Sequence, residues 1–319
     1  MKDVVLNVNS GKLSQSKTWA VIKRFRRERQ LWLLCLPIIV WVATFAYYPM
    51  YGIIIAFLKY IPGKPYLACD WAGLAYFEQF FNSPDLLMII RNTFAISALD
   101  LLFGFPAPII LALLINELFL RRFKKVVQTV SYMPYFVSWV VVANILFTLL
   151  STDGIVNKLL ADTGIINSPI AFLGTGKYFW WLITFSNIWK GIGWGSILYL
   201  SAIAGIDAEL YQAGATDGLG RFGMIWHITL PGIKPTIILL LILQIGGVLN
   251  AGFEQQLLIG NSQTRDYYEV IDTYIYKYGF QLGRYSYGAA IGLMRSVIAL
   301  GLVLLANKIS RKVTDLSII

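Results

Sequence analysis

Two apolar stretches of this chain carry polar and aromatic side chains that suit a hydroxyl-rich ligand. In the first stretch, Asn187, Lys190 and Trp194 are spaced i, i+3, i+7, which places them on one face of a helix. In the second stretch, Gln244 and Gln255 share a face at i, i+11. Because amides hydrogen-bond to hydroxyls and aromatic rings offer apolar faces, we expect a sugar path here. Its predicted residues are Asn187, Trp189, Lys190, Trp194, Gln244, Asn250, Glu254 and Arg295.

Five ionisable side chains lie within the apolar stretches or at their ends: Arg91, Asp100, Lys190, Glu254 and Arg295. A charge at the centre of a bilayer costs at least ~2.5 kcal/mol, so each needs a partner, a water-filled path or a route to the surface. Arg91 and Glu254 lie near outer span ends and can reach water. The other three are deeper, and either they pair with one another or they face the path. If Lys190 and Arg295 face it, an acidic, uronate-containing oligosaccharide is favoured.

Some tryptophans and glycines of the same stretches have structural explanations. Trp180 and Trp181 are expected to anchor a helix at the lipid interface. The glycines of the segment 191–195 favour close helix packing. Gly246 and Gly247 instead predict a hinge or a cavity, because non-helical backbone in a bilayer must be covered by protein or line a water-filled space.

The composition places these stretches in a membrane. Of the 319 residues, 57% are hydrophobic and only 14% are charged, whereas a soluble domain has about 25% charged residues. Six runs are long enough to cross a bilayer. We therefore predict an all-α integral membrane protein with six transmembrane helices, at 31–58, 88–119, 126–150, 178–205, 235–259 and 286–307.

The distribution of Lys and Arg predicts the orientation. Six spans put both termini on one side, where the loops and termini carry seventeen Lys and Arg, against seven on the other side. By the positive-inside rule the termini are cytoplasmic. We expect a basic cytoplasmic segment at 1–30 before an uncleaved anchor, a transmembrane domain at 31–307 and a cytoplasmic tail at 308–319. The net charge of +10 favours contact with anionic lipid rather than nucleic acid.

The loop 206–233, between the fourth and fifth spans, has the signals of a compact helical turn. Asp207 is a candidate N-cap for a short helix that reaches Asp217, and Gly218 suits a left-handed stop. A second short helix is expected at 221–227, closed by Leu230 and Pro231. Small side chains at 213–215 leave a surface that another protein can approach closely.

This loop resembles the cytoplasmic Glu-Ala-Ala loop of bacterial ABC importer permeases, which has a glycine after three residues and an Ile-x-Leu-Pro after nine more. Here the opening triplet is Gln212-Ala213-Gly214, so the usual glutamate and second alanine are replaced. The resemblance implies docking of an ATPase, while the absence of the glutamate questions any ion pair it makes there. The implied coupling residues are Gln212, Ala213, Gly214, Asp217, Gly218, Ile228, Leu230 and Pro231.

Other stretches, among them Tyr48-Pro-Met-Tyr-Gly52 and Trp189-Lys-Gly-Ile-Gly-Trp194, are similar to permeases of the carbohydrate-uptake family. Within it, the chain most resembles the complex-oligosaccharide branch, which includes alginate and rhamnogalacturonan-fragment permeases. The resemblance implies a type I importer in the bacterial cytoplasmic membrane. Its other parts would be a second permease subunit, an ATPase dimer that binds ATP and Mg, and an extracytoplasmic solute-binding protein.

Several other functions lack their residues in the sequence. There is no Gly-Lys-Ser/Thr phosphate loop, so this chain is not expected to hydrolyse ATP or to be an enzyme. His227 is the only histidine and there are two cysteines, so no metal site, cofactor or disulfide framework is predicted. A gradient-driven secondary sugar transporter is the main alternative, although such folds commonly contain internal repeats and none is evident here.

Overall fold

The computed structural model describes residues 28–314. Regular structure in this range is helical, and the one β-bridge described there joins Leu58 to Trp71. The chain divides into two compact units, Met1–Ile54 and Ile55–Ile319. Each unit is described by itself.

The first unit is dominated by one apolar helix. Helix α2 (Arg29–Val42) continues through a π-helical turn, η1 (Ala43–Tyr47), into a 3-10 helix, η2 (Tyr48–Phe57). The whole range Arg29–Phe57 is long and apolar enough to cross a membrane. None of the residues of α2 is buried within the chain. A helix that is apolar on all sides suits a bilayer, so the predicted stretch at 31–58 is confirmed as a helical candidate span.

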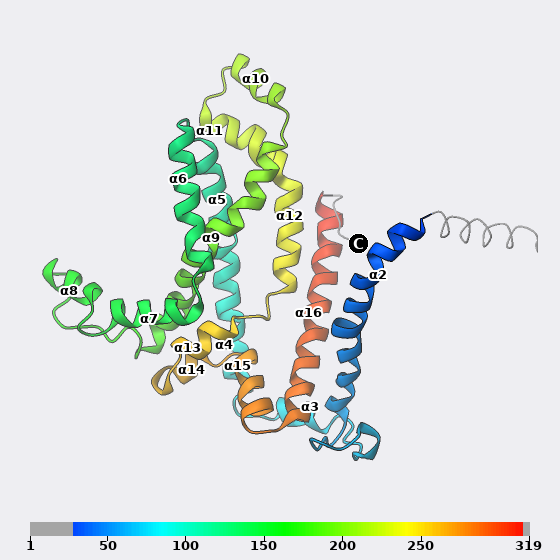
Figure 1. Cartoon of the computed structure of the whole chain (residues 1–319). Coiled ribbons are helices and arrows are strands. Elements are labelled where there is room, and N and C mark those ends of the chain that lie inside the picture. Colours follow the sequence, from blue (N-terminus) through cyan, green and yellow to red (C-terminus); the bar gives the residue numbers. More distant parts are fainter. Residues whose placement is uncertain (1–27, 315–319) are drawn as a thin grey trace, which may run out of the picture. The chain divides into compact units, whose positions relative to one another are not determined.

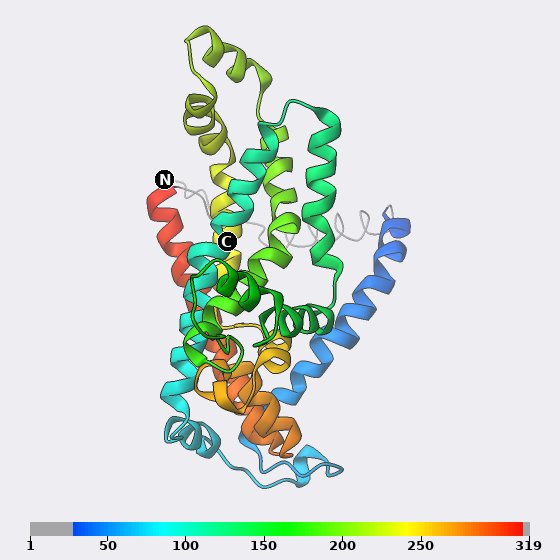
Figure 2. The same ribbon diagram turned by 90° about the vertical axis from the view of Figure 1, so that its left-hand side faces the viewer.

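The second unit is a helical bundle with short helices at both ends (Figures 1 and 2). Its first part contains η3 (Tyr66–Ala68), α3 (Ala75–Phe81), α4 (Leu86–Leu99), the π-helical η4 (Asp100–Gly104), α5 (Pro106–Asn116), α6 (Arg121–Tyr132), η5 (Met133–Phe136), α7 (Trp139–Leu150) and α8 (Ile155–Asp162).

The remaining elements are α9 (Gly176–Ala204), α10 (Ala208–Thr216), α11 (Arg221–Met224), η6 (Ile225–Thr229), α12 (Leu230–Gly246), α13 (Phe253–Ile259), η7 (Ser262–Thr264), α14 (Arg265–Tyr268), α15 (Ile271–Ile275), η8 (Tyr276–Gln281) and α16 (Tyr285–Thr314).

Within the described residues, five helical stretches are long and apolar enough to cross a membrane, or six if the bent pair α9 and α10 counts as one span. The stretch Leu86–Asn116 corresponds to the predicted 88–119, and Tyr285–Lys312 to the predicted 286–307. This agrees with an all-α membrane protein of five to six spans.

The predicted third span at 126–150 is wrong as a single helix. The chain leaves α6 after Tyr132, passes through η5 around Pro134, and starts α7 only after Ser138, whose side chain caps Val141. A proline disfavours the helical conformation of the residue before it and cannot donate a backbone hydrogen bond. Helix α6 lies alongside α9, whereas α7 and α8 run away from the bundle at a steep angle to it (Figure 1).

Helix α9 is the central element of the second unit, and it contacts α4, α5, α6, α12 and α14. Two of its glycines allow neighbouring helices to come close. A Cβ at Gly193 would lie 2.0 Å from the carbonyl oxygen of Ser131 on α6, and one at Gly195 would lie 2.9 Å from the Pro108 ring on α5. A Cβ at Gly191 would meet nothing within 4 Å. The packing explanation therefore holds for Gly193 and Gly195 but not for Gly191.

Three clusters of buried apolar residues hold the second unit together. One, around Ile203 and Ile233, joins α5, α9 and α12 near the turn that carries α10 and α11. A second, around Ile183 and Ile259, lies between α4, α7, α9 and α13. The third, around Phe80 and Tyr287, joins α3, α4, α15 and α16 at the end opposite α10 (Figures 1 and 2).

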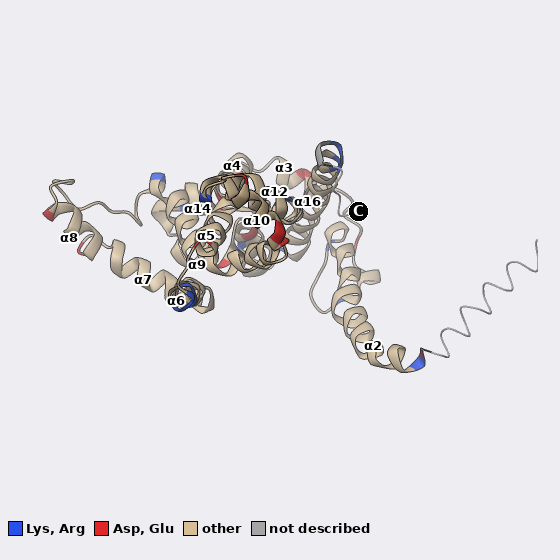
Figure 3. Cartoon of the chain, turned by 90° about the horizontal axis from the view of Figure 1, so that it is seen from above, with Lys and Arg blue, Asp and Glu red and all other residues tan. Residues whose placement is uncertain are grey.

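Charged residues are sparse along the long helices. In the view from above, most of the ribbon is uncharged, and Lys and Arg gather on α6, which starts with Arg121 (Figure 3). This is the composition expected where the flanking segments meet water and the rest meets lipid.

Candidate functional site

A cavity of about 550 Å³ opens between α9, η4 and two breaks in the helical bundle. This volume is typical of a small-molecule site. Its walls combine amides, charged groups and aromatic rings. The lining residues are Ile96, Ser97, Asp100, Leu101, Tyr135, Trp139, Asn187, Lys190, Gly191, Gln244, Gly247, Val248, Asn250, Ala251, Gly252 and Gln255.

One wall of the cavity is non-helical backbone between α12 and α13. Helix α12 ends at Gly246, and Gly252 adopts a left-handed φ of 85°. A Cβ at Gly252 would overlap the amide of Gln255, so this position requires glycine. The hydroxyl of Ser97 donates a hydrogen bond to the carbonyl of Val248, which satisfies part of the freed backbone. Helix α12 ends at Gly246 and Gly247 lines the cavity, so the cavity of the predicted pair of alternatives is present.

Two hydrogen bonds between side chains connect the amide groups of the cavity. The Gln244 amide donates to the Asp100 carboxylate at 2.9 Å, which links α12 to η4. The Gln255 amide donates to the Asn187 oxygen at 3.2 Å, which links α13 to α9. Gln244 and Gln255 therefore both line the cavity, but from two separate helices. The expectation that they share one helix face is wrong, because the chain breaks between them.

Lys190 lies against an aromatic wall. Its ammonium donates a hydrogen bond to the carbonyl of Tyr135 at 2.5 Å and lies 5.1 Å from the centre of the Tyr135 ring and 5.7 Å from that of Trp139. The ring of Trp194 stacks on Tyr135, with 4.6 Å between centroids and 6° between planes. Cation–π contacts of this kind stabilise an ammonium without neutralising it. The charge of Lys190 is therefore kept in the cavity.

Tyr135 and Trp139 were not among the predicted site residues. Both follow Pro134, at the break between α6 and α7, and this proline was the available signal. Because the sequence suggested a continuous span through this region, their aromatic side chains could not be placed beside Lys190. The break also leaves the Tyr135 carbonyl free to accept the hydrogen bond of Lys190.

Four predicted path residues are not among those that line the cavity: Trp189, Trp194, Glu254 and Arg295. Arg295 forms an ion pair with Asp272, which lies in α15. Burial raises the pKa of the Asp272 carboxyl, and the charge of Arg295 offsets part of this rise. Glu254 and Trp189 are exposed and do not line the cavity. Asp100, Lys190 and Arg295 do not pair with one another. Their partners are Gln244, Tyr135 and Asp272, respectively.

A second cavity, of about 370 Å³, adjoins the first. The two share Asp100, Asn187, Gly191 and Gln244. Most of the other residues that line the second cavity are apolar, among them Phe105 and Leu198. The hydrogen-bonding groups are thus concentrated in the larger cavity and at its junction with the smaller one.

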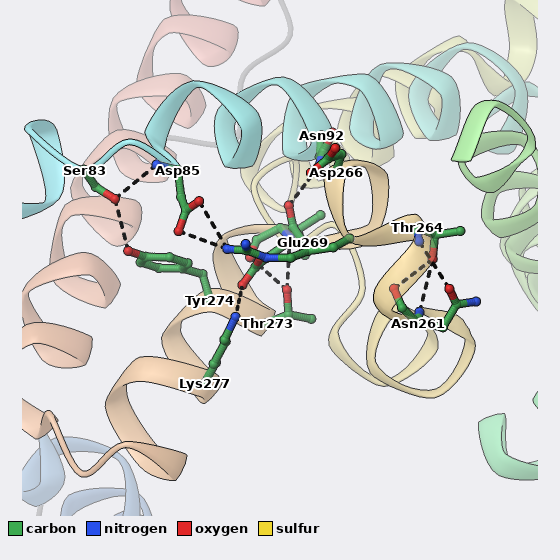
Figure 4. A network of polar contacts seen from close by, with 12 residues as sticks. Ser83, Asp85, Asn92, Asn261, Thr264, Asp266, Glu269, Thr273, Tyr274 and Lys277 are labelled. Atoms are coloured by element: carbon green, nitrogen blue, oxygen red, sulfur yellow. Dashed lines mark hydrogen bonds and ion pairs between the residues drawn. The ribbon is translucent and has the colours of Figure 1, made fainter. Parts of the chain in front are cut away.

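The end of the bundle opposite α10 is held by a network around Glu269 (Figure 4). The side chain of Glu269 is 1% exposed, and its carboxylate accepts hydrogen bonds from Arg265 at 2.7 Å and from Lys277 at 3.3 Å. Arg265 also reaches Asp85, just before α4, at 3.1 Å. The hydrogen bond to Glu269 raises the pKa of Arg265 above its ordinary value. One guanidinium therefore ties α14 to the start of α4.

Backbone groups extend this network. The amide of Asn92 donates to the carbonyl of Glu269 at 3.0 Å, and the hydroxyl of Thr93 accepts from the backbone N–H of Ile271 at 3.1 Å. The hydroxyl of Tyr274 lies 3.1 Å from that of Tyr287 on α16. Burial raises the pKa of Tyr274 to about 12, so this hydroxyl keeps its proton at neutral pH. The segment after α13 is thus fixed to both α4 and α16.

The turn between α10 and α11 is the second candidate site. Asp207 caps α10 by accepting a hydrogen bond from the backbone N–H of Glu209 at 3.0 Å. Gly218 has a φ of 77°, and the N–H of Leu219 donates to the carbonyl of Gly214 at 2.9 Å. The predicted cap, the predicted short helix and the predicted left-handed glycine are therefore confirmed.

The chain after this turn differs from the prediction. Helix α11 passes through the π-helical η6 directly into α12, with Pro231 in the first turn of α12, so Leu230 and Pro231 do not close a separate helix. The backbone N–H of Leu230 donates to the carbonyl of Ile225 across the π-helical turn, so the helix continues into α12. The hydroxyls of Tyr211 and Thr229 lie 2.9 Å apart and fasten α10 to η6.

The predicted coupling residues lie on α10, on the turn that follows it, on η6 and at the start of α12. Gln212, Ala213, Asp217 and Gly218 are exposed, as is Pro231. Gly214 is buried, and a Cβ there would lie 2.7 Å from Ile228. Ile228 and Leu230 are half-buried. Large apolar side chains nearby face outward, since Phe222 is 89% exposed and Trp226 is 69% exposed. Such a surface is typical of a protein or membrane contact.

Comparison with known proteins places these features in a family. The family model described as "Binding-protein-dependent transport system inner membrane component" matches residues 104–315. Protein LplB of Bacillus subtilis (strain 168) is 44% identical over 301 residues, which cover 94% of each chain. The polygalacturonan/rhamnogalacturonan transport system permease protein YteP of the same organism is 42% identical over 287 residues, 90% of this chain and 89% of that one.

Solved structures give the same result. A chain in the crystal structure of a bacterial alginate ABC transporter, in complex with an alginate pentasaccharide-bound periplasmic protein, superposes with a TM-score of 0.84 at 40% sequence identity. The match covers 93% of this chain and 99% of that one. A second structure, of a bacterial ABC transporter involved in the import of the acidic polysaccharide alginate, matches with the same score and identity.

Proposed function

The chain belongs to the family of binding-protein-dependent transport system inner membrane components, and we propose that it carries an acidic oligosaccharide through the 550 Å³ cavity. It is a multi-pass membrane permease of an ABC sugar importer and not an enzyme. The acidic substrate is the proposal. Two proteins similar to this chain support it by name, since alginate and polygalacturonan are both polyuronates.

The observation that carries the proposal is the position of Lys190. Its ammonium lines the cavity beside Tyr135 and Trp139, and hydrogen-bonding amides line the same space. An ammonium can bind a uronate carboxylate, while amides and aromatic faces suit the hydroxyls and the apolar face of a sugar ring. An ionisable residue within a span is a functional candidate by default. Lys190 is therefore assigned to the carboxylate, and Asn187, Gln244 and Asn250 to the hydroxyls.

The energy would come from partner subunits. We assign the turn of α10 and α11, with its exposed Gln212 and Phe222, to an ATPase dimer that binds ATP and Mg. Closure of that dimer would move α10, and through the Tyr211–Thr229 contact α12, so that the cavity changes from inward-facing to outward-facing. A second permease would complete the bundle. A solute-binding protein would deliver the sugar on the outside, with both termini of this chain in the cytoplasm.

Substitutions of Lys190 test whether the substrate is acidic. Uptake is measured in cells that express the native importer, with an oligogalacturonide and a neutral oligosaccharide of equal length as the two sugars. Lys190→Gln is expected to lower uptake of the oligogalacturonide at least about tenfold more than uptake of the neutral sugar, because a charge-assisted hydrogen bond is lost. Lys190→Arg keeps the charge and should retain part of the acidic preference.

Arg295→Gln is the matched control, because it also removes a cation from a span but one that is paired with Asp272 away from the cavity. It should affect both sugars equally. Equal loss of both sugars in Lys190→Gln would contradict the acidic substrate.

The gradient-driven alternative has its own test. The complete importer in proteoliposomes should accumulate sugar with ATP present and no ion gradient. Accumulation driven by a proton or sodium gradient without ATP would overturn the ATP-driven mechanism.

A further inference from the structure

The cavity contains an anion as well as a cation. Asp100 lines it from η4, in the same space as Lys190 of α9. Asp100 has a hydrogen bond from Gln244, and no ion pair involves it within residues 28–314. The partner of Asp100 is an uncharged amide, so no ion pair offsets the charge of its carboxylate. The cavity is therefore lined by one acidic and one basic side chain, which come from two different elements, η4 and α9.

The two charges belong to separate pairs of structural elements. Lys190 connects α9 to the aromatic wall at η5, whereas Asp100 connects η4 to α12. Asp100 also lines the smaller cavity, where most of the other lining residues are apolar. A sugar chain that reaches from the aromatic wall toward this junction thus passes from a cationic to an anionic environment.

These charges treat the rings of a sugar chain differently. A carboxylate on one ring is attracted to Lys190. A carboxylate on the next ring, placed toward Asp100, meets a like charge in a partly dehydrated space, where like charges repel more strongly than in water. A neutral ring in that place can instead donate its hydroxyls to the Asp100 carboxylate, which is an acceptor with free lone pairs.

We propose that Asp100 makes this permease selective for oligosaccharides in which a uronate neighbours a neutral sugar, and that it discriminates against chains of consecutive uronates. The inference rests on the proposed function, because it assumes that Lys190 receives the first carboxylate. It adds the residue that reads the neighbouring ring and the pattern of charges that the cavity accepts.

Asp100→Asn tests this directly. The variant removes the charge and keeps an oxygen that can accept the hydrogen bond of Gln244. Uptake is compared for two tetrasaccharides, one of four galacturonates and one in which galacturonate alternates with a neutral deoxyhexose. The ratio of kcat/KM for the homouronate to that for the alternating sugar is expected to rise about tenfold.

Asn187→Asp is the opposite variant. Its oxygen can still accept the hydrogen bond of Gln255, and it adds an anion to the same cavity. The homouronate-to-alternating ratio should therefore fall. This second variant also keeps the proposal testable if Asp100→Asn does not reach the membrane, which an immunoblot of the membrane fraction will show.

The outcomes separate the inference from the proposed function. Equal loss of uptake of acidic and neutral sugars in Lys190→Gln would show that Lys190 does not bind a carboxylate, and the role of Asp100 would fall with it. Suppose instead that Lys190→Gln lowers uptake of acidic sugars selectively, but neither Asp100→Asn nor Asn187→Asp alters the homouronate-to-alternating ratio. The role proposed for Asp100 is then wrong, and the acidic substrate stands. A rise of the homouronate-to-alternating ratio in Asp100→Asn, together with a fall of this ratio in Asn187→Asp, supports both the role of Asp100 and the acidic substrate.

Discussion

Replacing Gly218 with valine is expected to lower sugar uptake at least tenfold and to release the ATPase from the purified complex. Gly218 has a φ of 77°, and a Cβ built there meets no atom within 4 Å. The loss would therefore come from backbone conformation alone. A left-handed conformation costs an ordinary residue about 1–2 kcal/mol and suits a β-branched residue least. Uptake and co-purification of the ATPase measure the effect.

Gly220 provides the matched control for this substitution. It lies two residues further on the same exposed turn, also has open space around its Cβ, and has a φ of −73° that valine readily adopts. Gly220→Val should thus retain transport and ATPase binding. Normal uptake by Gly218→Val would show that the left-handed turn is not needed for coupling. Equal loss in both variants would attribute the defect to side-chain bulk.

Removing both cations from Glu269 should produce the largest loss of stability. The double variant Arg265→Met and Lys277→Met leaves a carboxylate that is 1% exposed without a charged partner. Breaking a fully buried ion pair by removing one side of it costs about 3–5 kcal/mol, and the cost here is expected to be lower because the two cations are 41% and 38% exposed. We expect a clear fall in the apparent Tm of the detergent-solubilised importer, measured by thermal unfolding.

A third substitution isolates the cause. Adding Glu269→Leu to the double variant removes the unpaired charge, and it should recover most of the lost Tm, because an apolar replacement of a buried ion pair is often neutral. Failure of the triple variant to recover would mean that Arg265 and Lys277 stabilise the protein through other contacts, such as the one between Arg265 and Asp85. An unchanged Tm in the double variant would contradict the role of the network.

Local rules predicted the parts of the molecule that depend on neighbouring residues. The cap at Asp207 and the left-handed Gly218 follow from residue type and position, and both are present. Long apolar runs predicted most of the spans for the same reason. Asn187 and Lys190 line one cavity because they lie about one helical turn apart on α9.

Features that depend on distant segments could not be predicted in this way. Arg295 was assigned to the path because no local pattern shows that Asp272 lies beside it. The pairing of Lys190 with Tyr135 joins residues 55 positions apart, and it requires a break that an apolar run of span length conceals. Gln255 lines the cavity as expected, but the single helix predicted to carry both Gln244 and Gln255 is interrupted at 247–252. Tertiary contacts decided each of these positions.

The hydrogen bond between Lys190 and the Tyr135 carbonyl fixes the position of the ammonium before a ligand arrives. An ammonium has three N–H donors and this contact uses one, so a carboxylate can bind another without displacing the backbone oxygen. The stacked rings of Tyr135 and Trp194 lie beside that ammonium, so the indole of Trp194 offers an optical signal of ligand binding.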